Sequence, residues 1–281
     1  MTRRPFAWRL ILRNGGGQAS ASAAIAVCAT AAYLHFGHEQ LHISTAFTGV
    51  LGTVMAIVLG FKNNSAYDRW WEARTLWGAI VNDSRSFARQ VEALLPADVS
   101  RELLARQVAF AYALRLHLSR REDRALLATW VPAEELPAEG NIPAALMRVQ
   151  GRRLAALARE AGLAPVAHME MEATLTRLTA AQGGCERIRN TPFPEQYDDV
   201  THALVWIFCI AFPFTVVGEL RYWTIPASIV ICFAFQAIDA VGRYLEDPFD
   251  GDAEDIPMLA LCRTIAQELQ PPVESLNQPI P

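Results

Sequence analysis

The stretch GVLGTVMAIVLGFKNNSAYDRWWEARTLWG, residues 49–78, decides the fold of this chain. The nineteen residues from Ile43 to Phe61 carry no charge, and no proline separates them from the polar residues that follow. The pattern therefore predicts one continuous helix that changes from apolar to polar at Lys62. Because a helix rises about 1.5 Å per residue, its apolar part spans roughly 30 Å, the thickness of a bilayer core.

Three further apolar segments frame the rest of the chain. They cover residues 15–36, which are also uncharged, residues 203–218 and residues 223–238. The last two are near the short limit for a membrane span, and each taken alone also fits a buried helix of a soluble protein. Four such segments in one chain predict an integral membrane protein with four transmembrane helices.

Positive charges indicate how these segments cross the membrane. The connection between the first two segments, residues 37–42, holds no arginine or lysine, and the connection between the last two holds only Arg221. Cytoplasmic loops of membrane proteins are enriched in these residues, so we expect both termini and the long middle region to be cytoplasmic. The charges that support this orientation are Arg3, Arg4, Arg9, Arg13, Lys62, Arg69, Arg74, Arg85 and Arg89.

The region between the second and third apolar segments is polar and helical in pattern. Its apolar positions recur with helical spacing, and no strand-like alternation of any length interrupts them. The prolines of residues 130–143 predict a loop, after which helices are expected over residues 144–161 and 166–182. We therefore expect an all-α chain with four parts: residues 1–62 with the first two transmembrane helices, residues 63–197 as a cytosolic helical region, residues 198–243 with the last two transmembrane helices, and residues 244–281 as a C-terminal cytosolic helix and tail.

Two stripes of residues run along the second apolar segment. Small residues, which let a neighbouring helix approach closely, form the first stripe: Gly52, Ala56 and Gly60. The adjacent stripe consists of Thr53, Ile57 and Phe61. One stripe fits against a neighbouring helix while the other faces an axis. Periodicity alone also fits Ile57 and Phe61 as plain lipid-facing or core residues.

The polar part of the same helix begins at Lys62 and is rich in tryptophan. Its first residues fit a solvated helix start. Trp70, Trp71 and Trp77 are too many aromatic residues for a helix that is only solvated. They predict that this part of the helix packs against other elements.

Composition and motifs exclude several classes of function. With a net charge of −4, the chain has no basic field to hold nucleic acid. Its five cysteines form no CxxC pair, which argues against a disulfide framework and a zinc site. No HExxH, GxSxG or GxxxxGK[ST] motif occurs, and the histidine pair at i, i+4, His38 and His42, which could bind a metal if its loop were helical, has only Glu39 beside it. We therefore expect neither an enzyme nor a bound cofactor.

Three blocks of the sequence resemble one known family. They are FKNNSAYDRWWEARTLWG at residues 61–78, GGCERIRNTPFPEQY at residues 183–197, and AIDAVGRYLEDPFDGDAEDIPMLALCRTI at residues 237–265. In their order and spacing they resemble the bestrophin family, in its bacterial branch. The resemblance covers roughly residues 3–268.

This resemblance implies a homopentameric ion channel in the lipid bilayer of the bacterial inner membrane, conducting small monovalent ions. Five copies of the second transmembrane helix would line a narrow neck, and the family's neck positions match Thr53, Ile57 and Phe61. Thr53 departs from the more apolar residue usual there. The family's second, cytosolic constriction, the aperture, matches Phe193. A constriction of apolar side chains gates by dewetting when narrow and passes hydrated ions when wide.

Ion selectivity stays open at the level of sequence. Animal members of the resembled family are chloride channels, whereas a bacterial relative selects cations. Carboxylates just after the aperture would favour cations if they face the axis, and they are Glu195, Asp198 and Asp199.

Two further hypotheses concern metal binding and ion conduction. Eukaryotic members form a calcium clasp at positions that match Asp247, Asp250 and Asp252, but bacterial members resemble one another in lacking the complete clasp. We therefore expect no bound metal. The alternative to a channel is a non-conducting membrane scaffold or sensor.

Overall fold

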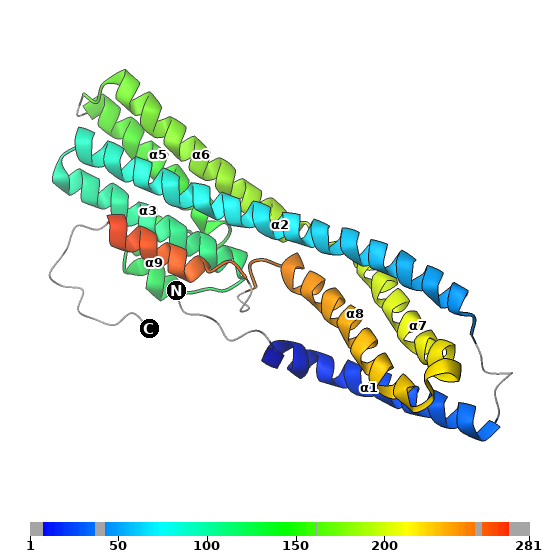
Figure 1. The fold of residues 1–281 in the computed structure, drawn as a ribbon. Coiled ribbons are helices and arrows are strands. Elements are labelled where there is room, and N and C mark those ends of the chain that lie inside the picture. Colours follow the sequence, from blue (N-terminus) through cyan, green and yellow to red (C-terminus); the bar gives the residue numbers. More distant parts are fainter. Residues whose placement is uncertain (1–7, 37–42, 161, 251–254, 270–281) are drawn as a thin grey trace. The chain divides into compact units, whose positions relative to one another are not determined.

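The computed structural model describes residues 8–36, 43–160, 162–250 and 255–269, and every regular element in that part of the chain is a helix (Figure 1). The chain divides into two compact units. The first consists of Met1–Arg69 and Pro192–Asp247, and the second of Trp70–Thr191 and Pro248–Pro281. We call them the apolar unit and the polar unit.

The apolar unit contains all four apolar segments, and each lies within a helix. They are α1 (Trp8–Phe36), the first part of α2 (Thr45–Leu94), α7 (Glu195–Leu220) and α8 (Thr224–Glu246). Among the described residues, two stretches are long and apolar enough to cross a membrane: Thr45–Leu94, and Gln196–Glu246, which covers α7 and α8. The apolar helix within α1, Ala19–His35, is shorter.

Packing in the apolar unit holds α1, α7 and α8 together, with α1 against both of the others (Figure 1). The short 3₁₀ turn Arg221–Trp223 connects α7 to α8, and Arg221 adopts a φ of 48° there. Helix α2 contributes Met55 and Leu59 to a cluster with Val205, Phe208, Cys209 and Cys232. A Cβ at Gly52 would lie 3.0 Å from the Phe208 ring, so this glycine permits a close approach of α2 and α7.

The small-residue stripe therefore packs at only one of its three positions. No atom lies within 4 Å of a Cβ placed at Gly60, and both Gly60 and Ala56 are exposed. Of the three small residues, only Gly52 has another helix from the described part of the chain packed closely against it.

The polar unit is a helical bundle around one large apolar cluster. It combines the second part of α2 with α3 (Ala97–Leu118), α5 (Ile142–Glu160), α6 (Pro165–Asn190) and α9 (Met258–Leu269), together with the short α4 (Arg124–Ala128) and η1 (Ala133–Glu135). Trp77 is fully buried in this cluster, which confirms that the tryptophan-rich part of α2 packs, although Trp71 is exposed.

Two boundaries differ from the sequence prediction. Helix α6 continues to Asn190, whereas we expected it to end at Gln182, before Gly183 and Gly184. A Cβ at Gly184 would lie 2.8 Å from Cδ1 of Leu76, so this glycine serves close packing on α2 and does not end the helix. The proline-rich residues 130–143 include a 3₁₀ turn, and α5 begins within them at Ile142.

Candidate functional site

One face of α2 carries the stripe Thr53, Ile57 and Phe61. The side chains of Ile57 and Phe61 are 53% and 67% exposed in the single chain. The Thr53 hydroxyl donates to the backbone oxygen of Gly49 at 2.9 Å, one turn earlier. The polar group on this face thus already has a partner within its own helix, and the face is otherwise apolar.

The opposite face of α2 is buried, and it ends in a charge. Lys62 directly follows the exposed Phe61, yet its side chain has 0% exposure. An ammonium group removed from water requires compensating negative charge close by. Two helices of the apolar unit supply that charge.

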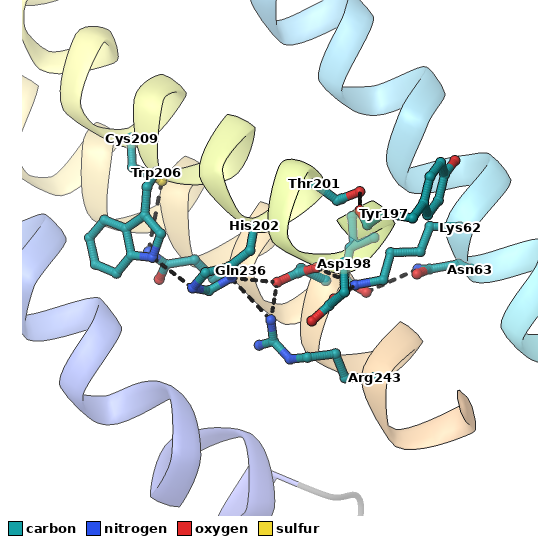
Figure 2. Close-up of polar contacts among 12 residues, drawn as sticks. Lys62, Asn63, Tyr197, Asp198, Thr201, His202, Trp206, Cys209, Gln236 and Arg243 are labelled. Carbon is teal, nitrogen blue, oxygen red and sulfur yellow. Dashed lines mark hydrogen bonds and ion pairs between the residues drawn. The ribbon is translucent and has the colours of Figure 1, made fainter. Parts of the chain in front are cut away.

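Three carboxylates surround the Lys62 ammonium. Asp198 in the first turn of α7 forms an ion pair with Nζ (Figure 2). Asp239 and Glu246 of α8 lie 3.1 Å and 3.6 Å from Nζ. The ion pairs therefore tie α2 to both α7 and α8, and we refer to these four residues as the lysine cluster.

Asp239, which is 1% exposed, connects the lysine cluster to a second set of polar groups. Arg243 donates to its Oδ2 at 2.5 Å, and Nδ1 of His202 lies 3.1 Å from the same oxygen (Figure 2). Trp206 donates from Nε1 to Nε2 of His202 at 3.0 Å. Nη1 of Arg243 also lies 3.0 Å from Nδ1 of His202, so Asp239, Arg243, His202 and Trp206 form one connected set of polar contacts.

Backbone contacts also hold α2 against α8. Asn63 donates to the carbonyl oxygen of Ile238 at 2.9 Å, and Arg69 donates to that of Glu246 at 2.7 Å. A Cβ at Gly242 would overlap the Asn63 side chain, so the absence of a side chain at Gly242 makes room for this contact.

The aperture candidate lies immediately before α7. Phe193 is half-buried, and its ring meets that of Tyr197 edge-on, with 5.9 Å between ring centroids. The backbone N–H groups of Tyr197 and Asp198 both donate to the carbonyl oxygen of Pro194, at 2.9 Å and 3.4 Å. The segment that carries Phe193 is thus fixed to the first turn of α7.

The three predicted carboxylates after the aperture differ in their surroundings. Asp198 pairs with Lys62, and its side chain is 30% exposed. Asp199 is exposed and has no ion-pair partner among the described side chains. Glu195 begins α7, and its side chain lies outside the described part. Hence Lys62 offsets the charge of one member of the predicted ring.

The calcium candidates also receive separate surroundings. Asp247 follows the last residue of α8 and is exposed, and Asp250 pairs with Arg189 at 2.6 Å. Asp252 lies outside the described residues, as do His38, Glu39 and His42. Within the described residues, no group of three histidine, cysteine, aspartate or glutamate side chains is arranged to hold a metal ion.

Sequence reasoning missed the lysine cluster. Lys62 is the only lysine of the chain, and it stands at the first position after an uncharged span. Asp239 and Arg243 follow the fourth apolar segment at a spacing of one helical turn. A charge beside an apolar membrane segment costs free energy unless it is paired. These positions therefore could have indicated that Lys62, Asp239 and Arg243 pair inside the protein.

The helices, the exposed apolar surface and the buried charges define the class of the protein, which is an α-helical membrane protein. Comparison with known proteins gives the family. The family model described as "Bacterial/Fungal Bestrophin protein" matches residues 16–271. The chain belongs to this bestrophin family.

Individual relatives agree with the family assignment. The voltage-dependent anion channel-forming protein YneE of Escherichia coli K12 is 36% identical over 241 residues, which cover 84% of this chain and 78% of YneE. A protein of the same description from Ralstonia nicotianae is also 36% identical, over 83% of this chain and 79% of its own length. The crystal structure of a bacterial bestrophin homolog from Klebsiella pneumoniae aligns with a TM-score of 0.85 and 32% identity, covering 89% of this chain and 95% of that one.

Proposed function

We propose that the chain is the subunit of a homopentameric ion channel and is not an enzyme. Five α2 helices would surround the axis, with Thr53, Ile57 and Phe61 lining the neck. The observation that carries this proposal is the exposed apolar face of α2 in the single chain. An exposed apolar stripe of this kind indicates a surface that is buried against other molecules. Symmetric copies of the same helix would bury it. The descriptions of the relatives as channel-forming proteins support the same function.

The proposal includes an arrangement in the membrane. Helices α1, α2, α7 and α8 would cross the bacterial inner membrane, with both termini and the polar unit in the cytoplasm. The arginines before the first segment and after the second support this orientation. The buried ion pairs of the lysine cluster suit the cytoplasmic end of the spans, since charges within a bilayer are tolerated where they pair inside the protein.

The neck would act by its apolar surface. Ile57 and Phe61 offer no group that replaces the hydration shell of an ion, so a narrow ring of these side chains excludes water and ions together. Widening the ring admits hydrated ions. Thr53 makes one end of the neck less apolar, because its hydroxyl oxygen can still accept a hydrogen bond from water.

Phe193 would form the second constriction, and the groups around it bear on selectivity. A phenyl ring presents a positive edge to anions and a negative face to cations. The carboxylates that remain to attract cations are Asp199 and Glu195, because Asp198 pairs with Lys62. The relatives are described as anion channels, so these two carboxylates are the residues whose charge distinguishes the alternatives.

Ion flux through the purified protein in a planar bilayer with asymmetric salt tests the function. We expect currents from the wild type and a higher conductance or open probability from Ile57→Ala, since a smaller side chain widens the neck and eases its wetting. Val230→Ala is the matched control, because Val230 is also an exposed apolar side chain, at 67% against 53% for Ile57, but lies on α8. The reversal potential measures selectivity.

Two outcomes would contradict this proposal. If neither the wild type nor Ile57→Ala conducts, the non-conducting scaffold or sensor becomes the better interpretation. If Val230→Ala raises the current as much as Ile57→Ala does, the neck is not formed by this face of α2.

A further inference from the structure

Phe61 and Phe193, the two candidate constriction residues of the apolar unit, lie at the ends of one short chain of contacts. Phe61 is covalently adjacent to Lys62, whose ammonium pairs with Asp198. Asp198 is adjacent to Tyr197, whose ring packs edge-on against Phe193. A displacement of either phenylalanine therefore has a direct route to the other.

Each contact along this route is constrained. The Lys62 side chain is fully buried, so its ammonium depends on carboxylates for compensation, and Asp198, which is 30% exposed, is one of them. The first turn of α7 is fixed to Pro194 through the N–H groups of Tyr197 and Asp198, and Thr201 donates to the carbonyl oxygen of Tyr197 at 2.7 Å. The route thus combines one fully buried side chain with a hydrogen-bonded helix turn, so that a shift of Asp198 moves the turn that carries Tyr197, although Phe61 and Tyr197 are themselves 67% and 38% exposed.

We propose that Lys62 is a positioning residue that couples the neck to the aperture, acting through its ion pair with Asp198. This inference rests on the channel function proposed above and goes beyond it, because two constrictions in series have no need to influence each other. With the ion pair intact, a change at the aperture alters the opening of the neck. Without it, the two constrictions act independently.

The lysine cluster allows the coupling contact to be removed without leaving Lys62 unpaired. Asp239 and Glu246 hold the ammonium from α8, whereas Asp198 alone joins it to α7 and the aperture segment. Loss of the Asp198 carboxylate also leaves two carboxylates opposite two cations, Lys62 and Arg243. Asp198→Ala should therefore fold, while Lys62 variants place the whole cluster at risk.

The test is a double-mutant cycle between Phe193→Ala and Asp198→Ala, with open probability in planar bilayers as the readout. In the otherwise wild-type channel, we expect Phe193→Ala to change the open probability about fivefold, which lies within the range of coupling energies between residues connected by contacts. In the Asp198→Ala background the same substitution should change it less than about twofold. Asp198→Glu, which restores the carboxylate, should restore the coupling.

Asp199→Ala is the matched control, because it removes the same charge one residue further on without touching Lys62. Coupling between Phe193 and the open probability should persist in that background. If Phe193→Ala changes ion permeability but not open probability, or if its effect is the same with and without Asp198, the inference is wrong while the channel function stands. Absence of current in the wild type would contradict the proposed function itself.

Discussion

In the polar unit, most large apolar side chains are buried in one continuous cluster, whereas in the apolar unit the buried cluster consists of six residues. Many large apolar side chains of the apolar unit lie instead at the surface, among them Val50, Ile57, Phe61, Ile207, Ile210 and Val230. The polar unit thus buries its apolar side chains as water-soluble proteins do, whereas the apolar unit leaves many of them exposed. The departure indicates that lipid or further subunits surround the apolar unit.

Each unit also buries one cation, and the two differ in how far their partners reach water. Arg106 of the polar unit is 3% exposed and donates to Glu135 at 2.7 Å and to Glu102 at 3.1 Å, and both of these carboxylates are partly exposed. Of the three partners of Lys62, Asp239 is 1% exposed, Glu246 15% and Asp198 30%. Breaking the pairs of a buried charge costs less when every partner can turn to water than when one partner, here Asp239, is itself buried.

Removing each buried cation should give the largest contrast between the units. Lys62→Met leaves three carboxylates, of which Asp239 keeps its pair with Arg243, and we expect a loss of about 3–5 kcal/mol in the free energy of unfolding. Arg106→Met leaves Glu102 paired with Arg153 and lets Glu135 turn to water, but buried Gln150 loses the donor to its Oε1, so the loss should be about 1–3 kcal/mol. Thermal unfolding in detergent, followed by tryptophan fluorescence, measures both. Equal losses would contradict the contrast.

Two helical glycines allow a finer comparison. At Gly242, a methyl group would displace Asn63 from its hydrogen bond to Ile238, so we expect Gly242→Ala to cost about 1–2 kcal/mol despite the gain in helix propensity. At Gly184 the methyl group would meet the flexible end of Leu76, which can rotate away. Gly184→Ala should therefore stay within about 0.5 kcal/mol of the wild type. The same thermal unfolding measurement applies, and a larger loss at Gly184 would reverse the interpretation.

Much of the fold could be predicted from sequence because its signals are local. The uncharged segments and the unbroken pattern after Ile43 predict α1, α2, α7 and α8 without knowledge of their partners. The end of α6 could not be predicted, because a glycine pair ends a helix in most settings. Here Gly184 lies inside the helix and beside Leu76, a neighbour far away in sequence.

Part of the candidate site could likewise be predicted from local sequence patterns, and part could not. The stripe of Thr53, Ile57 and Phe61 follows from helical periodicity, and its exposure in the single chain agrees with a face left for other subunits. The pairing of Lys62 with Asp198 joins residues 136 positions apart, and no local pattern encodes such a contact. For this reason the sequence placed Asp198 among the ring carboxylates, whereas the structure places its charge beside a lysine.

The smallest expected effect concerns pH and the polar unit. Burial by itself would raise the pKa of Glu102, but the hydrogen bonds and positive charge of Arg153 and Arg106 hold this pKa below its ordinary value of 4.5. A carboxylate with a lowered pKa stabilises the fold above its unfolded-state pKa, and the stabilisation disappears as the pH falls through the folded-state value. The stabilisation from Glu102 is therefore complete at pH 7 and fades below about pH 4.5.

Comparing Glu102→Gln with the wild type isolates this contribution from those of other carboxylates. We expect the wild type to unfold at a higher temperature at pH 7, and the difference to shrink steadily as the pH is lowered past 4.5. The difference should be small throughout, because Glu102 is 37% exposed and solvent screens its ion pairs. Glu122→Gln, which removes an exposed carboxylate from the same unit, is the matched control. A difference between wild type and Glu102→Gln that grows on acidification would show that burial, and not the two arginines, controls the ionisation of Glu102.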